Sequence, residues 1–418
     1  MDAAAHVEGK AKAAKEASRV LALASTRAKN EALAQMARGL EERTGAILDA
    51  NRHDLERVRA AGHARAFVDR LTLTEGRIEE MAAGLRHVAS LPDPVGETVE
   101  TVRRPSGLEI ARVRVPLGVI GFIYESRPNV TADAAGLCLK SGNAVLLRGG
   151  SEALESNTLL AQILGKAVEK AGLPPEVVQA VETADRAGVM AMLTLDRYLD
   201  LIIPRGGEEF VRLVNERATV PVLKHDKGLC HLFVDEGADL EMAVNLTVNA
   251  KAQRVSVCNS LETLLVHAAI APALLPRLAA RLAEVPVEVR ADERARALMP
   301  GARPAEPADW DAEYLDYILA VRVVDDLDAA VAHIRRHGSG LAESIVTRDI
   351  RRARRFTQEV DAAAVLVNAS TRLVDGSQFG LGAEMGISTS RVHARGPVGV
   401  RELTTTKFVV WGDGHIRE

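Results

Sequence analysis

The interpretation of the whole chain starts from one stretch, Asn249-Ala-Lys-Ala-Gln-Arg-Val-Ser-Val-Cys-Asn-Ser-Leu-Glu-Thr263. It places Cys258 in a polar segment between a helix-like run and an apolar, strand-like run. Lys251 and Arg254 lie just upstream, and a nearby cation lowers the pKa of a thiol and makes it a nucleophile. Most free cysteines are instead small buried hydrophobic residues. The polar neighbours of Cys258 favour a nucleophile over a core residue.

Length and composition limit the classes of protein to consider. The chain has 418 residues, 47% of them hydrophobic and 26% charged, so we expect two or more domains. A net charge of −4 does not favour a nucleic-acid or membrane partner. The chain has 3 cysteines, no CxxC pair, no signal-like N-terminus and no membrane-spanning run. These features predict a cytoplasmic protein.

The first hundred residues are mainly helical in pattern. Residues 3–61 predict two or three helices, and Thr74 is a plausible N-cap of another that ends near residue 90. Residues 101–115 differ, because they resemble two strands around a Pro-Gly turn. An isolated hairpin is marginal in water, so it needs a partner, and the β-branched run 402–411 offers one.

The remaining chain alternates between strand-like and helix-like runs, which indicates parallel βαβ units. We predict two α/β lobes that meet near residues 224–228. The predicted strands of the first lobe are 119–123, 144–147, 177–181, 199–203 and 220–223, and its predicted helices are 132–140, 153–171, 186–193 and 208–216. The predicted strands of the second lobe are 231–234, 261–266, 285–289, 317–324, 344–346 and 364–367.

Two strand–glycine–helix segments in the first lobe are candidate ligand sites. Residues 144–151 run from a strand through Gly149 and Gly150 to Ser151, and a helix N-terminus offers unpaired N–H groups to ligand oxygens. A plain βα turn explains the pattern about as well. A carboxylate at such a strand end favours NAD, whereas the cation Arg148 suits the 2′-phosphate of NADP.

The second such segment, 201–210, contains Gly206 and Gly207. Glu208 and Glu209 follow directly and would repel a phosphate that they faced. The loop 124–130 also follows a predicted strand, at the strand end where α/β folds place their sites.

The segment Gln253-Arg-Val-Ser-Val-Cys-Asn259 resembles the nucleophile segment of the gamma-glutamyl phosphate reductase family. This family is a branch of the aldehyde dehydrogenase superfamily that reduces an acyl phosphate in proline biosynthesis. The resemblance extends over nearly the whole chain and includes 368–372 and 379–389. It implies an aldehyde-dehydrogenase-like α/β fold with two Rossmann-like lobes and a β-hairpin oligomerisation element.

The resemblance also assigns roles to individual residues. It implies that Cys258 is the nucleophile and that the Asn129 amide donates to the oxyanion. The doubly anionic substrate needs cations, for which we expect Arg127, Lys251 and Arg254. For the cofactor, NADPH, the implied binding residues are Arg148, Gly149, Gly150 and Ser151 at the adenosine end, Gly206 and Gly207 at the pyrophosphate, and Glu313 at the nicotinamide ribose.

The same resemblance implies a division of labour along the chain. The NADPH-binding domain would comprise 1–100, 116–225 and part of 373–397, and the catalytic domain would comprise 226–372. Residues 101–115 and 398–418 would form the oligomerisation element of a homodimer or homotetramer. The implied activity is the NADPH-dependent reduction of L-glutamyl 5-phosphate, with functional coupling to glutamate 5-kinase.

Some residues depart from the family pattern. Leu341 and Ala342 stand where the family has a histidine and a hydroxyl residue, and Val255 replaces a proline. An enzyme of the same superfamily that acts on another acyl phosphate or aldehyde therefore stays an alternative, as does a non-catalytic scaffold. Oxidation with hydrolysis needs a base to activate water, and 224–228 contains no glutamate at the expected place.

Overall fold

The computed structural model describes residues 2–63, 65–125, 127–223 and 227–417. The chain divides into two compact units. The first unit comprises Met1–His225, Gly380–Gly386 and Val398–Glu418, and the second comprises Asp226–Phe379 and Ile387–Pro397. Of the segment 373–397, only 380–386 joins the first unit. None of the helices formed by the described residues could span a membrane.

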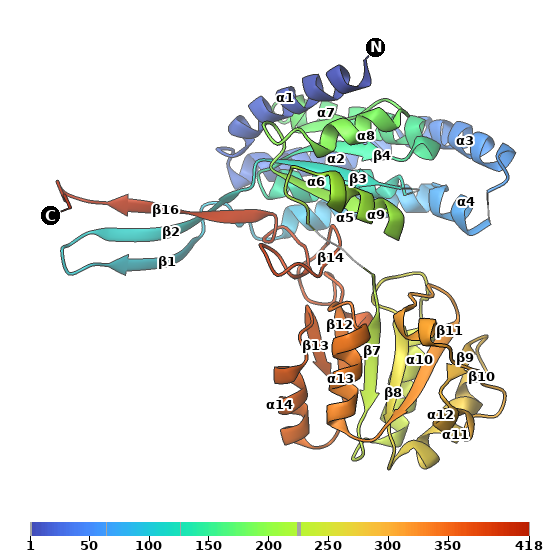
Figure 1. Cartoon of the computed structure of the whole chain (residues 1–418). Helices are drawn as coiled ribbons and strands as arrows, with labels where there is room; N and C mark the ends of the chain where they lie inside the picture. The colour runs from blue at the N-terminus through green and yellow to red at the C-terminus, as the bar shows by residue number, and fades with distance from the viewer. Residues whose placement is uncertain (1, 64, 126, 224–226, 418) are drawn as a thin grey trace. The chain divides into compact units, whose positions relative to one another are not determined.

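The N-terminal part of the first unit is helical, as predicted. Asp2, Ser25 and Thr74 each accept a hydrogen bond from a backbone N–H of the following helix and so cap its N-terminus. The helices are α1 (Ala3–Leu21), α2 (Thr26–Glu42), α3 (Thr44–Ala60), α4 (Arg65–Leu71) and α5 (Glu75–Ser90) (Figure 1).

A parallel sheet with strand order β5-β4-β3-β6 forms the centre of the first unit. Its strands are β3 (Val119–Tyr124), β4 (Ala144–Gly149), β5 (Val178–Ala180) and β6 (Leu201–Arg205). The connecting helices are α6 (Asn129–Lys140), α7 (Leu154–Lys170) and α8 (Arg186–Leu193), and α9 (Glu208–Arg217) follows β6. Every residue of β3 is buried, as expected for a strand covered on both faces.

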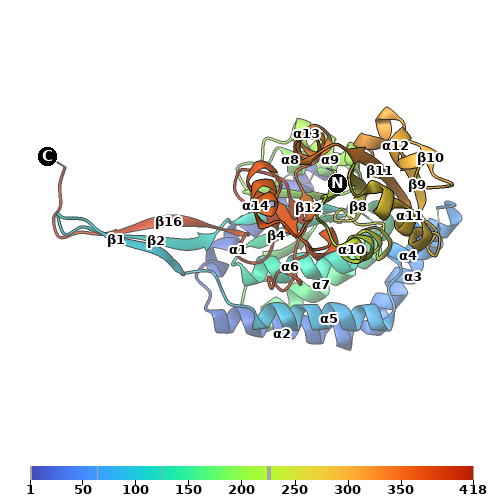
Figure 2. The same ribbon diagram turned by 90° about the horizontal axis from the view of Figure 1, so that it is seen from below.

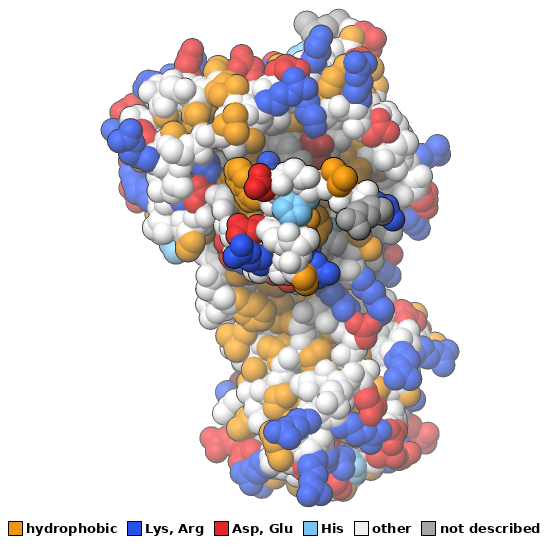
Figure 3. Space-filling model, turned by 90° about the vertical axis from the view of Figure 1, so that its left-hand side faces the viewer, with side chains coloured by type: hydrophobic (Ala, Val, Ile, Leu, Met, Phe, Trp, Pro, Cys, Tyr) orange, Lys and Arg blue, Asp and Glu red, His pale blue; other side chains and the backbone are white. Residues whose placement is uncertain are grey.

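A three-stranded antiparallel ribbon with order β1-β2-β16 pairs a hairpin that follows the N-terminal helices with the C-terminal strand. It consists of β1 (Thr98–Arg103), β2 (Glu109–Pro116) and β16 (Thr404–Trp411), so the predicted pairing of the hairpin with the C-terminal strand is confirmed. Figures 1 and 2 both show it extending from the helices of the first unit. Figure 3 looks toward its tip, where hydrophobic and charged side chains are mixed.

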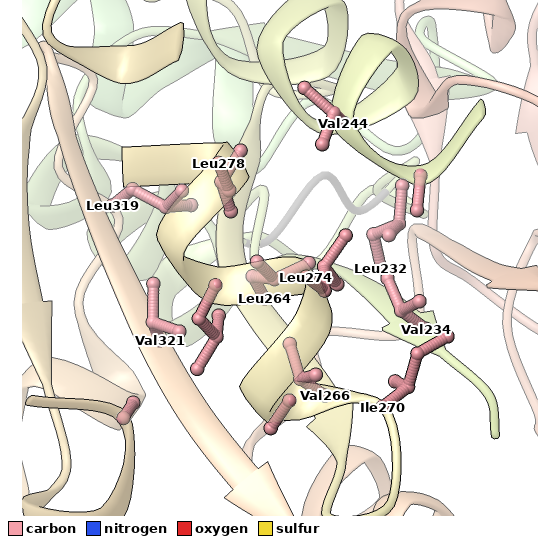
Figure 4. Packing of buried hydrophobic residues seen from close by; sticks show 14 of the residues in the cluster. Leu232, Val234, Val244, Leu264, Val266, Ile270, Leu274, Leu278, Leu319 and Val321 are labelled. Atoms are coloured by element: carbon pink, nitrogen blue, oxygen red, sulfur yellow. The ribbon is translucent and has the colours of Figure 1, made fainter. Parts of the chain in front are cut away.

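The second unit is built on a mostly buried seven-stranded sheet. Leu274 and Leu278 of α11 pack on Leu264 and Val266 of β8, as Figure 4 shows. The strands, in sheet order, are β10 (Arg303–Pro304), β9 (Glu288–Ala291), β11 (Ile318–Val324), β8 (Leu261–His267), β7 (Cys230–Val234), β12 (Ala342–Val346) and β13 (Ala364–Val367). The helices are α10 (Leu240–Ala252), α11 (Ala271–Leu282), α12 (Glu293–Arg296), α13 (Leu327–His337) and α14 (Ile350–Glu359), and β14 (Ile387–Ser388) pairs with β15 (Gly396–Pro397).

Two predicted strands were wrong in detail, and a proline explains each. Residues 220–223 form only an isolated bridge between Val222 and Ile202, because Pro221 has no N–H to donate. The strand predicted at 285–289 begins later, at Glu288, after the turn in which Val287 N donates to Val285 O. Pro286 lies inside that turn.

The start of β3 provides a test of the first unit. Gly118 has φ +132°, and a Cβ there would lie 2.1 Å from Oδ2 of Asp200. The same carboxylate accepts from Val119 N at 2.8 Å and from Lys15 Nζ of α1 at 2.6 Å. Gly118→Ala should therefore lower the Tm, because it displaces Asp200 as well as straining the backbone.

Gly172→Ala is the matched control, because Gly172 has φ +80° and open space around it. The Gly172→Ala variant should lose only the cost of the strained backbone, about 1–2 kcal/mol of unfolding free energy. Thermal unfolding of both variants measures the difference, and equal losses of Tm would contradict the role given to Asp200.

Candidate active site

The carboxyl ends of three strands lie side by side in the first unit. The register pairs Tyr124 of β3 with Gly149 of β4 and with Arg205 of β6. The segments that follow, beginning at Glu125, Gly150 and Gly206, therefore start at one edge of the sheet. The chain reaches β6 on the far side of β3 after β4 and β5, so the strand order reverses between β3 and β6. Such a reversal is where open α/β sheets bind ligands.

The turn after β4 combines a buried cation with a close approach of the backbone. Arg148 is 9% exposed, and its Nη2 donates to the carbonyl of Ala184 at 3.4 Å. Its Nε has no partner among the described residues, and burial lowers the pKa of Arg148. A Cβ on Gly149 would lie 1.9 Å from the amide nitrogen of Asn157, so only glycine fits there. The turn leads through a 3₁₀ turn, Ser151–Ala153, into α7, and the carboxylates of Glu152 in this turn and of Glu125 act on Arg148 to raise its pKa.

The turn after β6 already holds a negative charge. Gly207 is the N-cap of α9, and its N–H donates to Oε2 of Glu125 at 3.2 Å. Glu208 and Glu209 occupy the first turn of α9. A ligand phosphate at this helix N-terminus would require the exposed Glu125 side chain to move away. This charge makes Gly206 and Gly207 the weakest part of the predicted cofactor site.

The loop after β3 leads into α6, which begins at Asn129. The Asn129 amide nitrogen donates to Oδ2 of Asp133 at 3.4 Å, and burial raises the pKa of Asp133 to about 6. Arg127 is half-buried, and its carbonyl accepts from Val130 N at 3.1 Å. Ser126, also in this loop, lies outside the described residues, as do Lys224, His225 and Asp226 of the segment between the predicted lobes.

In the second unit, Cys258 lies in the segment between α10 and β8 and is half-buried. The Cys230 thiol donates to the carbonyl of Cys258 at 3.4 Å. Cys138 and Cys230 are fully buried, and burial raises the pKa of both thiols well above the ordinary value. Both are core residues, as the sequence predicts, so Cys258 is the best placed of the three to react.

Lys251 occupies a different place from the one expected of a substrate ligand. Its side chain is fully buried, and its Nζ is 2.7 Å from Oε2 of Glu262 in β8. Burial lowers the pKa of Lys251 and raises the pKa of Glu262 to about 7. Because the ammonium is enclosed and already paired, this geometry favours a structural role and removes Lys251 from our substrate-binding set.

The ion pair also supports the turn that carries Glu313. Glu262 Oε1 accepts from Leu315 N at 3.4 Å, and Leu315 has φ +51°. Lys251 Nζ lies 5.8 Å from the ring centre of Tyr314. Glu313 itself is half-buried in this turn, which precedes β11. The predicted ribose-binding residue therefore lies on a turn fixed by buried charges.

Sequence reasoning gave no role to Arg372, which the structure places beside the Cys258 segment. Its Nε donates to Oε1 of Gln253 at 3.0 Å, and its Nη1 donates to the side-chain oxygen of Asn259. Burial lowers the pKa of Arg372, and the charge of Arg254 lowers it further, while negative charge on Asp375 and Cys258 acts in the opposite direction. Arg254 and Cys258 therefore both lie close enough to Arg372 for their charges to affect its pKa.

The only sequence signal for Arg372 was its place in the family-like segment 368–372. The chain reverses after β13 at Asn368, which has φ +54°, and then packs against the Cys258 segment. Thr371 Oγ1 donates to the carbonyl of Asn259 at 2.8 Å, and the Asn259 amide donates to the carbonyl of Val374 at 2.9 Å. Spacing in the sequence does not reveal such a reversal.

Comparison with known proteins identifies the family. The model of the aldehyde dehydrogenase family matches residues 1–299 and 310–409. The chain belongs to the aldehyde dehydrogenase family. It is 54% identical over 418 residues to the gamma-glutamyl phosphate reductase of Moorella thermoacetica, with 100% of both chains covered. It is 55% identical over 407 residues to that of Carboxydothermus hydrogenoformans, with 97% of this chain and 98% of the relative covered.

Solved structures agree with this assignment. The crystal structure of the gamma-glutamyl phosphate reductase from Thermotoga maritima has a TM-score of 0.97 at 50% identity and covers 99% of this chain and 100% of its own. A glyceraldehyde-3-phosphate dehydrogenase from Methanocaldococcus jannaschii, complexed with NADP, shares the fold with a TM-score of 0.68 at 15% identity over 98% of this chain and 95% of its own. The predicted aldehyde dehydrogenase fold is confirmed, and the chain is an oxidoreductase of this family.

The predicted site residues fall into two groups, each defined within its own unit. The first unit contains Arg127, Asn129, Arg148, Gly149, Gly150, Ser151, Gly206 and Gly207. The second contains Lys251, Arg254, Cys258 and Glu313, to which the structure adds Arg372.

The buried pair predicts a pH-dependent stability defect. Lys251→Met leaves Glu262 buried without a counter-charge, so the folded-state pKa of Glu262 should rise above about 7. A raised folded-state pKa means stability that is lost as the pH rises through it. The variant's loss of unfolding free energy relative to the wild type should therefore be small at pH 6 and grow by up to about 1.4 kcal/mol per pH unit above about pH 7, which a Tm series from pH 6 to 9 follows.

Lys251→Met/Glu262→Leu should remove this pH dependence, because no charge is left to bury. Lys166→Met, on the exposed face of α7, is the control for loss of a lysine. A Lys251→Met deficit that stays constant from pH 6 to 9 would contradict the proposed cause.

Proposed function

We propose that this enzyme uses NADPH to reduce L-glutamyl 5-phosphate to L-glutamate 5-semialdehyde, releasing phosphate, in proline biosynthesis. The observation that carries the proposal is more than 50% identity, over the full length, to reductases of that name. The half-buried thiol of Cys258, with Arg254 and Arg372 beside it, supplies a suitable nucleophile. All three cysteines are free, which fits the reducing cytoplasm as the proposed compartment.

The chemistry on the protein centres on Cys258. Its thiolate attacks the acyl carbon of the substrate, a carbon–sulfur bond forms, and phosphate leaves with the electrons of the broken carbon–oxygen bond. The positive charge of Arg254 and Arg372 favours the thiolate over the thiol. We assign the Asn129 amide to donate to the carbonyl oxygen as negative charge develops there. Bound NADPH supplies the hydride that reduces the thioester, after which the thiohemiacetal collapses to aldehyde and restores the thiol.

We propose that the first unit binds NADPH. Arg148 would take the 2′-phosphate, because a cation at this strand end suits that group better than a carboxylate does. Gly149, Gly150 and Ser151 would line the adenosine end, and Gly206 and Gly207 would meet the pyrophosphate once Glu125 has moved. Glu313 of the second unit would hold the nicotinamide ribose. An acyl phosphate reacts with water, so we also propose functional coupling to the glutamate 5-kinase.

A second candidate within the family oxidises an aldehyde and hydrolyses the thioester. Hydrolysis needs a carboxylate free to activate water. Glu262, four residues after Cys258, is fully engaged with Lys251 and with the backbone of Leu315. This observation favours phosphate over water as the group that accepts the acyl chain in the oxidative direction.

The reverse reaction tests the proposal. Purified enzyme with L-glutamate 5-semialdehyde and NADP should form NADPH only when phosphate or arsenate is present, measured at 340 nm as an absorbance increase. Cys258→Ser should lower this rate by at least about 10³-fold, because an alcohol is a much poorer nucleophile at neutral pH. Phosphate-independent NADPH formation would reject the phosphorylating mechanism, and full activity of Cys258→Ser would reject the nucleophile.

A non-catalytic scaffold of this fold makes a different prediction for the thiol. The rate of Cys258 alkylation by iodoacetamide is measured against pH. If the protein is catalytic, this rate should rise at a pH well below the pKa of an unperturbed cysteine. An ordinary profile, together with no quenching of protein fluorescence by NADPH, would support the scaffold.

We also propose that the ribbon joins two copies of the chain. β1 and β16 are the two edges of the ribbon, and unpaired edges favour pairing with another chain. Phe408, Val410 and Trp411 are exposed by 69%, 53% and 69%, so β16 presents an apolar surface as well as an edge. A homodimer or homotetramer would cover this surface (Figure 3).

Substitution tests this assembly better than removal of the C-terminus. Leu403 is buried, and its carbonyl accepts from the side chain of Asn143, so truncation before Arg401 would also disturb the first unit. Phe408→Glu/Val410→Glu should convert the oligomer to monomers in light scattering at constant Tm. Lys407→Glu, an exposed neighbour, should leave the oligomer intact. A monomeric wild-type protein, or an unaltered oligomer in the double variant, would contradict the model.

A further inference from the structure

Arg372 has the geometry of a ligand-binding arginine. Two neutral acceptors, the side chains of Gln253 and Asn259, hold its Nε and Nη1. Asn259 is itself buried and fixed by the carbonyl of Val374. The guanidinium is therefore oriented before any ligand arrives, and a pre-oriented fork loses little entropy on binding an oxyanion.

Arg372 has both a cation and a carboxylate nearby, but among the described residues neither it nor Arg254 is neutralised by a direct ion pair. Arg254 is exposed on the preceding segment and close enough to affect Arg372 electrostatically. Asp375 is the carboxylate that acts on Arg372 most strongly, and its Oδ1 accepts from the N–H and hydroxyl of Ser377. Within the described part of the chain, neither Arg254 nor Arg372 forms an ion pair. Two cations beside a thiol favour a bound anion over an empty surface.

The substrate assigned above carries two anionic groups at different distances from the reacting carbon. The phosphate is attached through one oxygen to the carbon that Cys258 attacks, whereas the α-carboxylate lies at the far end of the side chain. Arg372 is bonded to Asn259, the residue directly after Cys258. The position of Arg372 therefore suits the phosphate better than the α-carboxylate.

We propose that Arg372 binds the phosphate group of the acyl phosphate and holds it as it leaves, with Arg254 contributing at longer range. This inference rests on the proposed function and adds a residue and a role to it. In the forward direction Arg372 stabilises the charge that develops on the leaving oxygen. In the reverse direction it presents phosphate to the thioester, an oxygen of phosphate attacks the acyl carbon, and the carbon–sulfur bond breaks to release the Cys258 thiolate.

The reverse reaction separates the two anionic groups, because phosphate and L-glutamate 5-semialdehyde are then different substrates. Arg372→Ala should raise the KM for phosphate at least about 30-fold and leave the KM for the semialdehyde within about twofold. Arg372→Lys keeps the charge but loses the fork, so it should raise the KM for phosphate about tenfold. Arg354→Ala, on an exposed face of α14, is the matched control and should change neither constant.

A binding measurement without turnover completes the test. Inorganic phosphate should slow the alkylation of Cys258 in the wild type, and Arg372→Ala should need at least about 30-fold more phosphate for the same protection. A rise in the KM for the semialdehyde instead would place the α-carboxylate at Arg372 and overturn the inference, as would unchanged constants in Arg372→Lys. If the wild type shows no phosphate-dependent NADPH formation, the proposed function fails instead.

Discussion

Parallel strand pairing is the constraint on which both units depend. Parallel strands require crossovers, and their aligned register brings equivalent ends of different strands to one edge. In the first unit this places the loops after β3, β4 and β6 together, although Tyr124, Gly149 and Arg205 are far apart in sequence. In the second unit it brings Cys230, at the start of β7, next to Leu261, at the start of β8. The Cys258 segment immediately before β8 is therefore held against the start of β7.

Much of this arrangement could be predicted from local sequence. Strand, glycine and helix follow one another in 144–154 and in 201–208, and the structure has the elements in that order. Thr74 caps α5 because its short side chain can accept a hydrogen bond from a backbone N–H that has no partner within the helix. The two strands that were wrong in detail contain Pro221 and Pro286, and proline interrupts a ladder whatever its apolar neighbours favour.

The composition of the candidate site was harder to predict, because burial decides which charges are available. Lys251 and Arg254 are three residues apart in sequence, yet one side chain is fully enclosed and the other is exposed. The difference arises from Glu262, whose carboxylate lies on a strand buried on both faces and requires a counter-charge. Arg372 reaches the Cys258 segment only because the chain reverses at Asn368 and Thr371 is then tied to Asn259. Residue spacing in the sequence predicts neither the pairing of Lys251 with Glu262 nor the packing of Arg372 against the Cys258 segment.

These two arrangements differ in whether the positive charge is neutralised. Lys251 and Glu262 neutralise each other, so the pair supplies rigidity to the turn at Leu315 and little net charge. Arg372 is held by uncharged acceptors instead, so its charge stays available to a thiolate or an incoming phosphate. A carboxylate in the place of Asn259 or Gln253 would position the guanidinium equally well but cancel its charge. The amides therefore orient Arg372 while preserving the charge that the proposed chemistry needs.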